Sequence, residues 1–318
     1  MQIPTIADIQ AAHKRIKPFI HRTPVMSSKQ INTIFSSEIY LKCENFQKVG
    51  AFKFRGATNA ILQLTDEAKK NGVITHSSGN HAAALTHAAA VNGIKAYIVM
   101  PENAPAVKKN AVAGYGAEIT FCKPTLQARE ETTAGIIEKT GATLIHSYDD
   151  INVICGQGTA ALELLEEIPD LDIIIVPVGG GGLISGIVTA AKGISPGIIV
   201  YGAEPVNASD AYKSFVSGKL IPSVNPDTIA DGLLTSLSDR TFHIISRNVD
   251  NIYTVTEESI IESMLLIWER MKIIVEPSSA TTLAVIKENP GIFEGKKTGL
   301  IISGGNVDLR RLPFNKIS

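Results

Sequence analysis

The sequence predicts an α/β fold with two open, mostly parallel, twisted sheets that are covered by helices. Short runs of isoleucine and valine alternate along the chain with segments of helical spacing, which is the pattern of βαβ units. The apolar runs are continuous, as expected for strands that helices cover on both faces. Nine such runs are many for one open sheet, so we expect two sheets with the functional site in a cleft between them.

The predicted strands are short apolar runs bounded by turn residues. In chain order they are Glu38–Cys43, Val73–His76, Ala96–Met100, Glu118–Phe121, Thr143–His146, Ile173–Val178, Ile198–Gly202, Ile252–Val255 and Gly299–Ile302. Helical spacing between most of them predicts helices, among them His81–Val91, Gln157–Glu167 and Glu257–Met271.

Along the sequence, the predicted strands form an inner cluster near residues 76–147 and an outer cluster built from the segments on both sides of it. The alanine-rich helix His81–Val91 belongs to the inner cluster, where small side chains allow a helix to pack closely on a sheet. We therefore expect a small domain over residues 76–147 and a large domain built from residues 1–75 and 148–318.

The composition excludes several classes of protein. The chain has 318 residues, 44% of them hydrophobic, which is enough for a large core. A net charge of -1 gives no reason to expect a nucleic-acid or membrane partner. Cys43, Cys122 and Cys155 form no CxxC pair, so they indicate buried thiols in a reducing compartment. With no apolar leader and no run of 18 apolar residues, we expect a cytoplasmic protein.

Lys53 lies between two aromatic residues, Phe52 and Phe54. An amine that aromatic rings shield from water has a lowered pKa, which a lysine that forms Schiff bases requires. The alternative is a surface lysine whose stem covers aromatic carbon. Lys53 alone does not decide between the two.

Four consecutive glycines, Gly179, Gly180, Gly181 and Gly182, follow the predicted strand Ile173–Val178 and precede a helix. Such a turn lets consecutive N–H groups point at one anion, reinforced by the helix N-terminus. The spacing does not fit the dinucleotide fingerprint, and the lysine of a Walker A loop is absent. The run therefore favours a small monophosphate; the alternative is a tight turn with close helix–sheet packing.

A polar loop, Ser77-Ser78-Gly79-Asn80-His81, follows the second predicted strand and opens a helix. Its hydroxyl, amide and imidazole groups gather where backbone N–H groups are free, which suits a carboxylate or phenolate ligand. The alternative is ordinary N-capping by a serine.

Ser303 follows the last predicted strand, at the edge of the sheet where open α/β folds bind ligands. A plain turn is equally compatible with it. A candidate Schiff-base lysine, a monophosphate nest and a carboxylate loop together suggest pyridoxal phosphate acting on an amino acid. A non-catalytic module that binds a phosphorylated ligand would not need the lysine, and the glycine spacing argues against a nicotinamide dehydrogenase.

With these motifs, the chain resembles the fold-type II pyridoxal-phosphate enzymes, in the group of serine/threonine dehydratases and serine racemases. The resemblance covers nearly the whole chain. Its motifs, in order, are Glu44-Asn45-Phe46-Gln47 with Gly50–Gly56, Ser77–His81, Gly156-Gln157-Gly158-Thr159, Gly179–Gly182 and Ser303–Asp308.

The resemblance implies a role for each cofactor contact. Lys53 would hold pyridoxal phosphate through its amine, and Phe52 would pack on the ring. Gly179–Gly182 would bind the phosphate, Asn80 the ring hydroxyl oxygen and Ser303 the pyridine nitrogen.

The resemblance also implies how the substrate is held. The loop Ser77–His81 would bind it, including Gly79 and Asn80. Lys53 would move a proton at Cα on one face, and Ser78 would act as the second acid/base on the opposite face.

A cation site follows from the same resemblance. Glu204 and Asp210 would supply carboxylates and Ala208 a backbone carbonyl, a set of oxygens suited to Mg²⁺, Ca²⁺ or Mn²⁺. The alternative is a solvated helix start. This segment and Trp268–Lys272 are similar to eukaryotic serine racemases, which favours racemase over dehydratase.

Activation by ATP is a further possibility that the resemblance raises. Lys48 and Tyr115 match the pattern of nucleotide-activated racemases, whereas Val49 and Ala83 depart from it. A homodimer is also expected from the resemblance.

The expected activity is interconversion of L- and D-serine, with elimination of serine to pyruvate and ammonia. The alternative is a dehydratase of L-serine, L-threonine or threo-3-hydroxyaspartate with little racemisation. Both use the same cofactor residues, so those residues do not choose between them.

Overall fold

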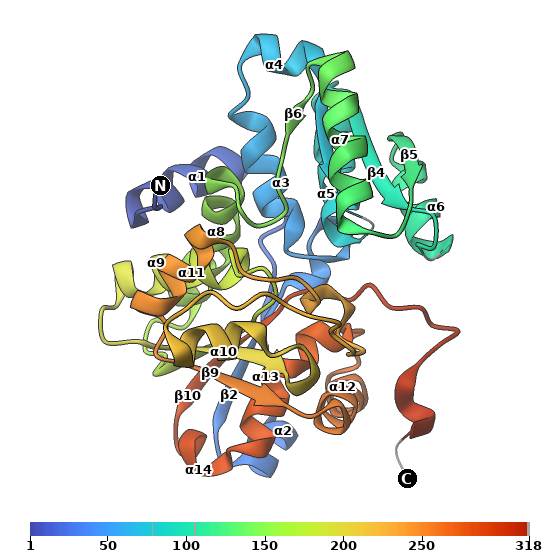
Figure 1. Cartoon of the computed structure of the whole chain (residues 1–318). Helices are drawn as coiled ribbons and strands as arrows, with labels where there is room; N and C mark the ends of the chain where they lie inside the picture. Colours follow the sequence, from blue (N-terminus) through green and yellow to red (C-terminus); the bar gives the residue numbers. More distant parts are fainter. Residues whose placement is uncertain (78, 105, 317–318) are drawn as a thin grey trace.

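The computed structural model describes residues 1–77, 79–104 and 106–316, and its larger sheet has six strands in the order β1-β2-β10-β7-β8-β9 (Figure 1). All neighbours in it are parallel except β1 and β2. The strands are β1 (Val25–Ser27), β2 (Glu38–Cys43), β7 (Ile173–Pro177), β8 (Ile199–Pro205), β9 (Asn251–Val255) and β10 (Lys297–Ile302).

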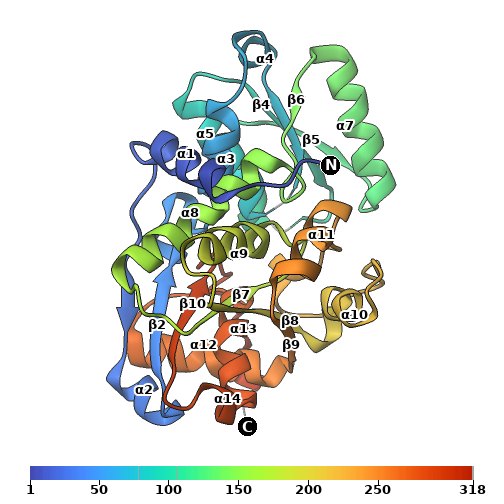
Figure 2. The ribbon, with the colours of Figure 1, turned by 90° about the vertical axis from the view of Figure 1, so that its left-hand side faces the viewer.

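The smaller sheet has four parallel strands in the order β5-β4-β3-β6. They are β3 (Val73–His76), β4 (Ala96–Pro101), β5 (Glu118–Cys122) and β6 (Thr143–Leu144). Figures 1 and 2 show the two sheets at opposite ends of the molecule. The predicted fold class, two mostly parallel sheets with helices, is confirmed; the residue limits of the two domains stay a prediction.

Helices pack on the sheets and between them. They are α1 (Ile6–Ile16), α2 (Lys29–Phe35), α3 (Lys53–Leu62), α4 (Asp66–Asn71), α5 (Asn80–Val91), α6 (Ala106–Gly114), α7 (Leu126–Thr140), α8 (Ile151–Glu167), α9 (Gly182–Ile194), α10 (Asp210–Ser217), α11 (Asp239–Asn248), α12 (Glu257–Met271), α13 (Pro277–Glu288) and α14 (Pro290–Phe293). In both views α1, α3 and α8 lie between the two sheets (Figure 2).

Strand β7 shows why its sequence is a continuous apolar run. Ile174 and Val176 belong to the core formed with α8 and α9, whereas Ile173 and Ile175 belong to the core formed with α12 and α13. Because successive side chains of a strand point to opposite faces, helices on both sides require apolar residues at every position.

Several predicted boundaries were wrong; β8, for example, ends at Pro205 and not at Gly202, and β10 begins at Lys297 and not at Gly299. β6 ends at Leu144, not at His146, because the ring of His146 accepts the backbone N–H of Asp149 (2.9 Å) and the chain turns there. α8 begins at Ile151, six residues before the prediction, since the Asp150 carboxylate caps its first turn. β1 was not predicted because three residues are too short for a recognisable pattern.

Glycines inside α8 mark where helices cross. A Cβ on Gly156 would lie 2.5 Å from the Cα of Gly56 on α3, and a Cβ on Gly158 would lie 2.7 Å from the carbonyl oxygen of Gly186 on α9. The Gly156–Thr159 motif therefore sets close helix packing.

Within the described residues, no helix is long and apolar enough to cross a membrane.

Candidate active site

Lys53 lies in the first turn of α3, and its amine donates a hydrogen bond to the carbonyl oxygen of Ser147 (2.8 Å). Burial lowers the pKa of Lys53 to about 8, and the carboxylate of Glu276 opposes that shift. The predicted lowering of the pKa is confirmed. The amine lies 5.0 Å from the centre of the Phe52 ring, whereas Phe54 is buried in the core beside α5 and does not flank it.

The four glycines form the turn between β7 and α9, as predicted. Gly181 has φ +84°, a left-handed conformation that favours glycine. Among the described residues, no hydrogen bond engages the N–H groups of Gly179 to Gly182. A row of free N–H groups at a helix N-terminus is the donor set that a phosphate needs.

Tyr148 explains two of these glycines and was missed in the sequence. A Cβ on Gly180 would lie 2.3 Å from the Tyr148 ring, and one on Gly182 would lie 2.9 Å from the Tyr148 Cα. Close packing, the alternative weighed for this run, therefore contributes to it as well. Tyr148 is about thirty residues away in the chain, and no local pattern marks it.

Asn80 begins α5, and its amide is held from both ends. Its Nδ2 donates to both carboxylate oxygens of Glu276 (3.2 Å each), and its Oδ1 accepts from Nδ2 of Asn306 (2.9 Å). Glu276 is buried and belongs to the loop before α13. These contacts bring together residues from three distant parts of the chain.

Ser303 follows the end of β10 and is only 3% exposed. Its hydroxyl lies 3.1 Å from that of Ser279 on α13, which in turn accepts the N–H of Gly304 (2.9 Å). Ser279, which sequence reasoning missed, therefore fixes the Ser303 side chain. A neutral hydroxyl held in this way is a hydrogen-bonding partner rather than a charge.

The loop before α5 is described except for Ser78, so the proposed second acid/base lies outside the described residues. Gly79 occupies the N-cap position of α5 without a side-chain cap, and the Ser77 hydroxyl accepts the Gly79 N–H (3.4 Å). Ser77 thus does not cap the helix. His81 is buried, its Nε2 donates to the carbonyl of Ile145 (3.1 Å), and burial lowers its pKa to about 3. The ring is therefore neutral.

Beneath Lys53, a buried ion network ties α3 to β2 and α8. Arg55 donates to Glu44 through Nε (2.7 Å) and Nη2 (2.8 Å), and to Glu163 through Nη1 (2.9 Å) and Nη2 (2.7 Å). Lys42 donates to Glu163 and to the carbonyl of Thr23, both at 2.7 Å. Two cations thus meet two carboxylates, and all four side chains are at most 2% exposed.

The predicted cation ligands lie between β8 and α10. Glu204 is 1% exposed and accepts the N–H groups of Ala211 (2.9 Å) and Tyr212 (2.8 Å), while burial raises its pKa to about 8. Burial also raises the pKa of Asp210 to about 6, and both of its oxygens are buried without a partner of normal hydrogen-bonding geometry. Ala208 lies in the turn between them.

Buried carboxylate oxygens without a hydrogen bond of normal geometry fit a cation, and a cavity of about 180 Å³ opens beside Ala208 and Asp210. In the described part of the chain, no group of three or more His, Cys, Asp or Glu side chains forms a metal site. The expected site depends instead on two carboxylates and a carbonyl.

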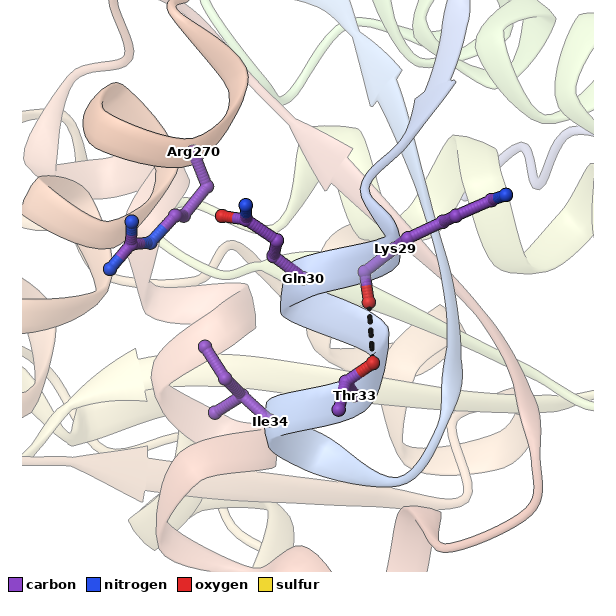
Figure 3. A pocket seen from close by; sticks show the side chains of 5 residues that line it. All are labelled: Lys29, Gln30, Thr33, Ile34 and Arg270. Carbon is purple, nitrogen blue, oxygen red and sulfur yellow. Dashed lines mark hydrogen bonds between the residues drawn. The ribbon is translucent and has the colours of Figure 1, made fainter.

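The structure has a second hollow, of about 420 Å³, on the surface between α2 and α12. Figure 3 shows Gln30 and Ile34 of α2 facing Arg270 of α12 across it, while the Thr33 hydroxyl donates to the carbonyl of Lys29. None of these residues was predicted as part of the site.

The residues around Lys53 fit the cofactor expected from the sequence. The amine with a lowered pKa, the free N–H groups of the glycine turn and the fixed Asn80 and Ser303 match the reactive and polar groups of pyridoxal phosphate. When bound, this cofactor supplies an electron sink for the carbanion that forms when an amino acid loses its Cα proton.

Known proteins match this chain over nearly its whole length. The chain is 54% identical over 309 residues to serine racemase of Dictyostelium discoideum, covering 96% of this chain and 95% of the relative. It is 49% identical over 315 residues to β-hydroxyaspartate dehydratase of Paracoccus denitrificans, covering 99% and 100%. The crystal structure of the Dictyostelium racemase superposes with a TM-score of 0.92 at 54% identity, covering 96% of this chain and 99% of that one.

A family model described as "Pyridoxal-phosphate dependent enzyme" matches residues 16–304. This range includes Lys53, the glycine turn and Ser303. The protein therefore belongs to the pyridoxal-phosphate dependent enzyme family.

Proposed function

We propose that the protein is a serine racemase that interconverts L- and D-serine and also eliminates water from serine, giving pyruvate and ammonia. The observation that carries this proposal is the lysine amine of lowered pKa in a chain 54% identical to a serine racemase. With a pKa of about 8, Lys53 has an appreciable neutral fraction near pH 7, as a base at Cα needs.

Each residue around Lys53 has a proposed task. Gly179–Gly182 bind the phosphate through their N–H groups, Phe52 packs on the ring, and Asn80 donates to the ring oxygen. Ser303 contacts the pyridine nitrogen with a hydroxyl, which does not enforce protonation there as a carboxylate would. The loop Ser77–His81 binds the substrate carboxylate.

Inversion at Cα requires an acid or base on each face of the substrate. We assign Lys53 to one face and Ser78 to the other. The test is chiral analysis of the products from L-serine in the wild type and in the Ser78→Ala variant. We expect pyruvate formation to continue and D-serine formation to stop. Racemisation that survives the substitution would overturn the two-base assignment.

A dehydratase of hydroxylated amino acids is the second candidate, favoured by the 49% identity to β-hydroxyaspartate dehydratase. The two candidates differ in product. A panel of L-serine, D-serine, L-threonine and threo-3-hydroxyaspartate separates them, because a dedicated dehydratase gives oxoacid and ammonia with little D-amino acid.

We propose that Glu204, Asp210 and the Ala208 carbonyl bind a divalent cation, Mg²⁺ before Ca²⁺ or Mn²⁺. The support is chemical: two buried carboxylates lie close together, and no donor meets the oxygens of Asp210 with normal hydrogen-bonding geometry. Calorimetric titration of metal-free protein with each cation tests this proposal. Absence of binding in the wild type would refute it.

ATP as an activator also remains a proposal. Lys48 and Tyr115 belong to one contact chain, in which the Lys48 amine stands over Phe54, Phe54 contacts His87 and His87 contacts Tyr115. Enzyme activity measured at increasing ATP concentrations, in the wild type and in Tyr115→Ala, tests whether this series of contacts lies at a nucleotide site.

We further propose a homodimer in the cytoplasm that acts on a free amino acid. We also propose that the chain divides into a small domain, residues 76–147, and a large domain, residues 1–75 and 148–318. The exposed Ile34 beside the hollow of Figure 3 is a candidate interface residue, at 54% exposure. Sedimentation of the wild type and of Ile34→Glu tests the dimer, and cell fractionation tests the location.

A further inference from the structure

Glu276 lies where the two halves of the site meet. It is 4% exposed, occupies the N-cap position of α13, and donates its backbone N–H to the carbonyl of Gly304 (3.0 Å). A Cβ on Gly304 would lie 2.9 Å from the carboxylate, so a glycine is needed there for the acid to fit. Its backbone and its surroundings therefore fix the position of this carboxylate.

The carboxylate determines how Asn80 is oriented. A carboxylate only accepts hydrogen bonds, so the side of the Asn80 amide that faces Glu276 must be the NH₂ group. Asn306 fixes the other end, because its Nδ2 donates to Oδ1 of Asn80 and its backbone N–H donates to Glu276 (3.2 Å). One N–H of Asn80 is taken by Glu276, which leaves the second N–H for a ligand.

The same contact joins elements of both sheets. Asn80 begins α5, the helix after β3 of the four-stranded sheet, whereas Glu276 and Asn306 lie beside β10 of the six-stranded sheet. Loss of the carboxylate would leave the Asn80 amide held only by Asn306 and would weaken the connection between the sheets.

We propose that Glu276 is a positioning residue that aims one N–H of Asn80 at the ring oxygen of the cofactor and balances the charge of Lys53. This inference rests on the proposed function, which gives Asn80 its cofactor contact. Glu276 acts through Asn80 and Lys53 and needs no contact of its own with the substrate.

The charge of Glu276 makes a separate contribution at Lys53. Its carboxylate raises the pKa of Lys53, opposing burial. Two neighbouring histidines also sense Lys53, but burial lowers the pKa of His81 to about 3 and that of His146 to about 4, so both are neutral when Lys53 titrates. Removal of the carboxylate should therefore lower the pKa of Lys53.

The test uses cofactor-free protein and pyridoxal phosphate as the probe, and it reads binding rather than turnover. In Glu276→Gln we expect the dissociation constant of pyridoxal phosphate to rise by about 10- to 100-fold, as for the loss of a buried hydrogen bond to a charged group. Capture of the cofactor by Lys53 needs the neutral amine, and Glu276 raises the pKa of that amine. The pH midpoint, at which half of the cofactor is bound, should therefore be lower in Glu276→Gln than in the wild type. An unchanged or higher midpoint would overturn the charge role.

Two further variants separate orientation from charge. Glu276→Asp keeps the charge but shortens the reach to Asn80, so affinity should fall while the pH midpoint stays near that of the wild type. In an Asn80→Ala background, Glu276→Gln should have little further effect on affinity. If Glu276→Gln lowers the affinity for pyridoxal phosphate as much in the Asn80→Ala background as in the wild type, Glu276 does not act through Asn80.

Lys53→Ala distinguishes failure of this inference from failure of the proposed function. If Lys53→Ala keeps the visible absorption band of lysine-bound cofactor, the proposed cofactor site is wrong. If that band disappears as expected but Glu276→Gln binds cofactor like the wild type, only the role of Glu276 is wrong.

Discussion

Two groups of buried charged side chains differ in how their charges are compensated. Beneath α3, the carboxylates of Glu44 and Glu163 receive hydrogen bonds from Arg55, so the group is neutral without any ligand. Before α10, Glu204 receives only backbone N–H groups and Asp210 has no donor of normal geometry. In the first group the buried charges compensate one another, as expected of a structural support. In the second group the carboxylates lack a compensating charge, as expected of a site that binds a cation.

The pKa shifts of the two groups differ in the same way. Although burial acts to raise the pKa of Glu163, the hydrogen bonds and charge of Arg55, with help from Lys42, lower it to about 2. Burial without such partners raises the pKa of Glu204 to about 8. Similar burial of the same side chain thus gives opposite shifts, and the neighbouring cation makes the difference.

Removal of Arg55 should give the largest effect. In Arg55→Met, two buried carboxylates lose their main partner, so we expect the free energy of unfolding to fall by about 3–5 kcal/mol in urea titration. Arg22→Ala is the matched control, because Arg22 pairs with Glu166 at the surface, where both side chains are about half exposed or more. There we expect a loss below about 1 kcal/mol. Equal losses in both variants would refute a special role for the buried network.

Mg²⁺ should stabilise the second group by a smaller amount. At 100 times its dissociation constant, a cation that binds only the folded protein adds about 2.7 kcal/mol. We expect Mg²⁺ to raise the melting temperature of the wild type, and to leave that of Glu204→Gln/Asp210→Asn unchanged. Calorimetric scans with Mg²⁺ and with chelator check this expectation. The same rise in the double variant would place the cation elsewhere.

Local sequence patterns locate several residues of the candidate site and most of the strands. The glycine turn, Lys53 and Ser303 follow strands or precede helices, so local patterns locate them and the sheet topology then brings them to one region. The apolar strands were found for the same reason, because burial on both faces leaves a continuous run.

The partners of these residues could not be predicted in the same way. Glu276 is 196 residues from Asn80, and Glu163 is 108 residues from Arg55. Charged residues are usually exposed, so composition favours a solvated position for each of them. Only the fold shows that Arg55 faces two acids and that the oxygens of Asp210 are buried without a hydrogen bond of normal geometry.

The smallest expected effect concerns acid and the network beneath α3. Since the folded-state pKa of Glu163 lies below its unfolded value, its stabilising contribution is complete above about pH 4.5 and is lost as the pH falls towards 2. We expect unfolding free energy to fall more steeply over this window in the wild type than in Glu163→Gln. The loss should be smaller than in Arg55→Met, because protonation neutralises one carboxylate and leaves Arg55 paired with Glu44. Glu166→Gln, on the same helix but 66% exposed at its side chain, should keep nearly the wild-type slope. An identical slope in Glu163→Gln and the wild type would mean that Arg55 does not hold Glu163 ionised, and the contrast between the two buried groups would then lose its electrostatic basis.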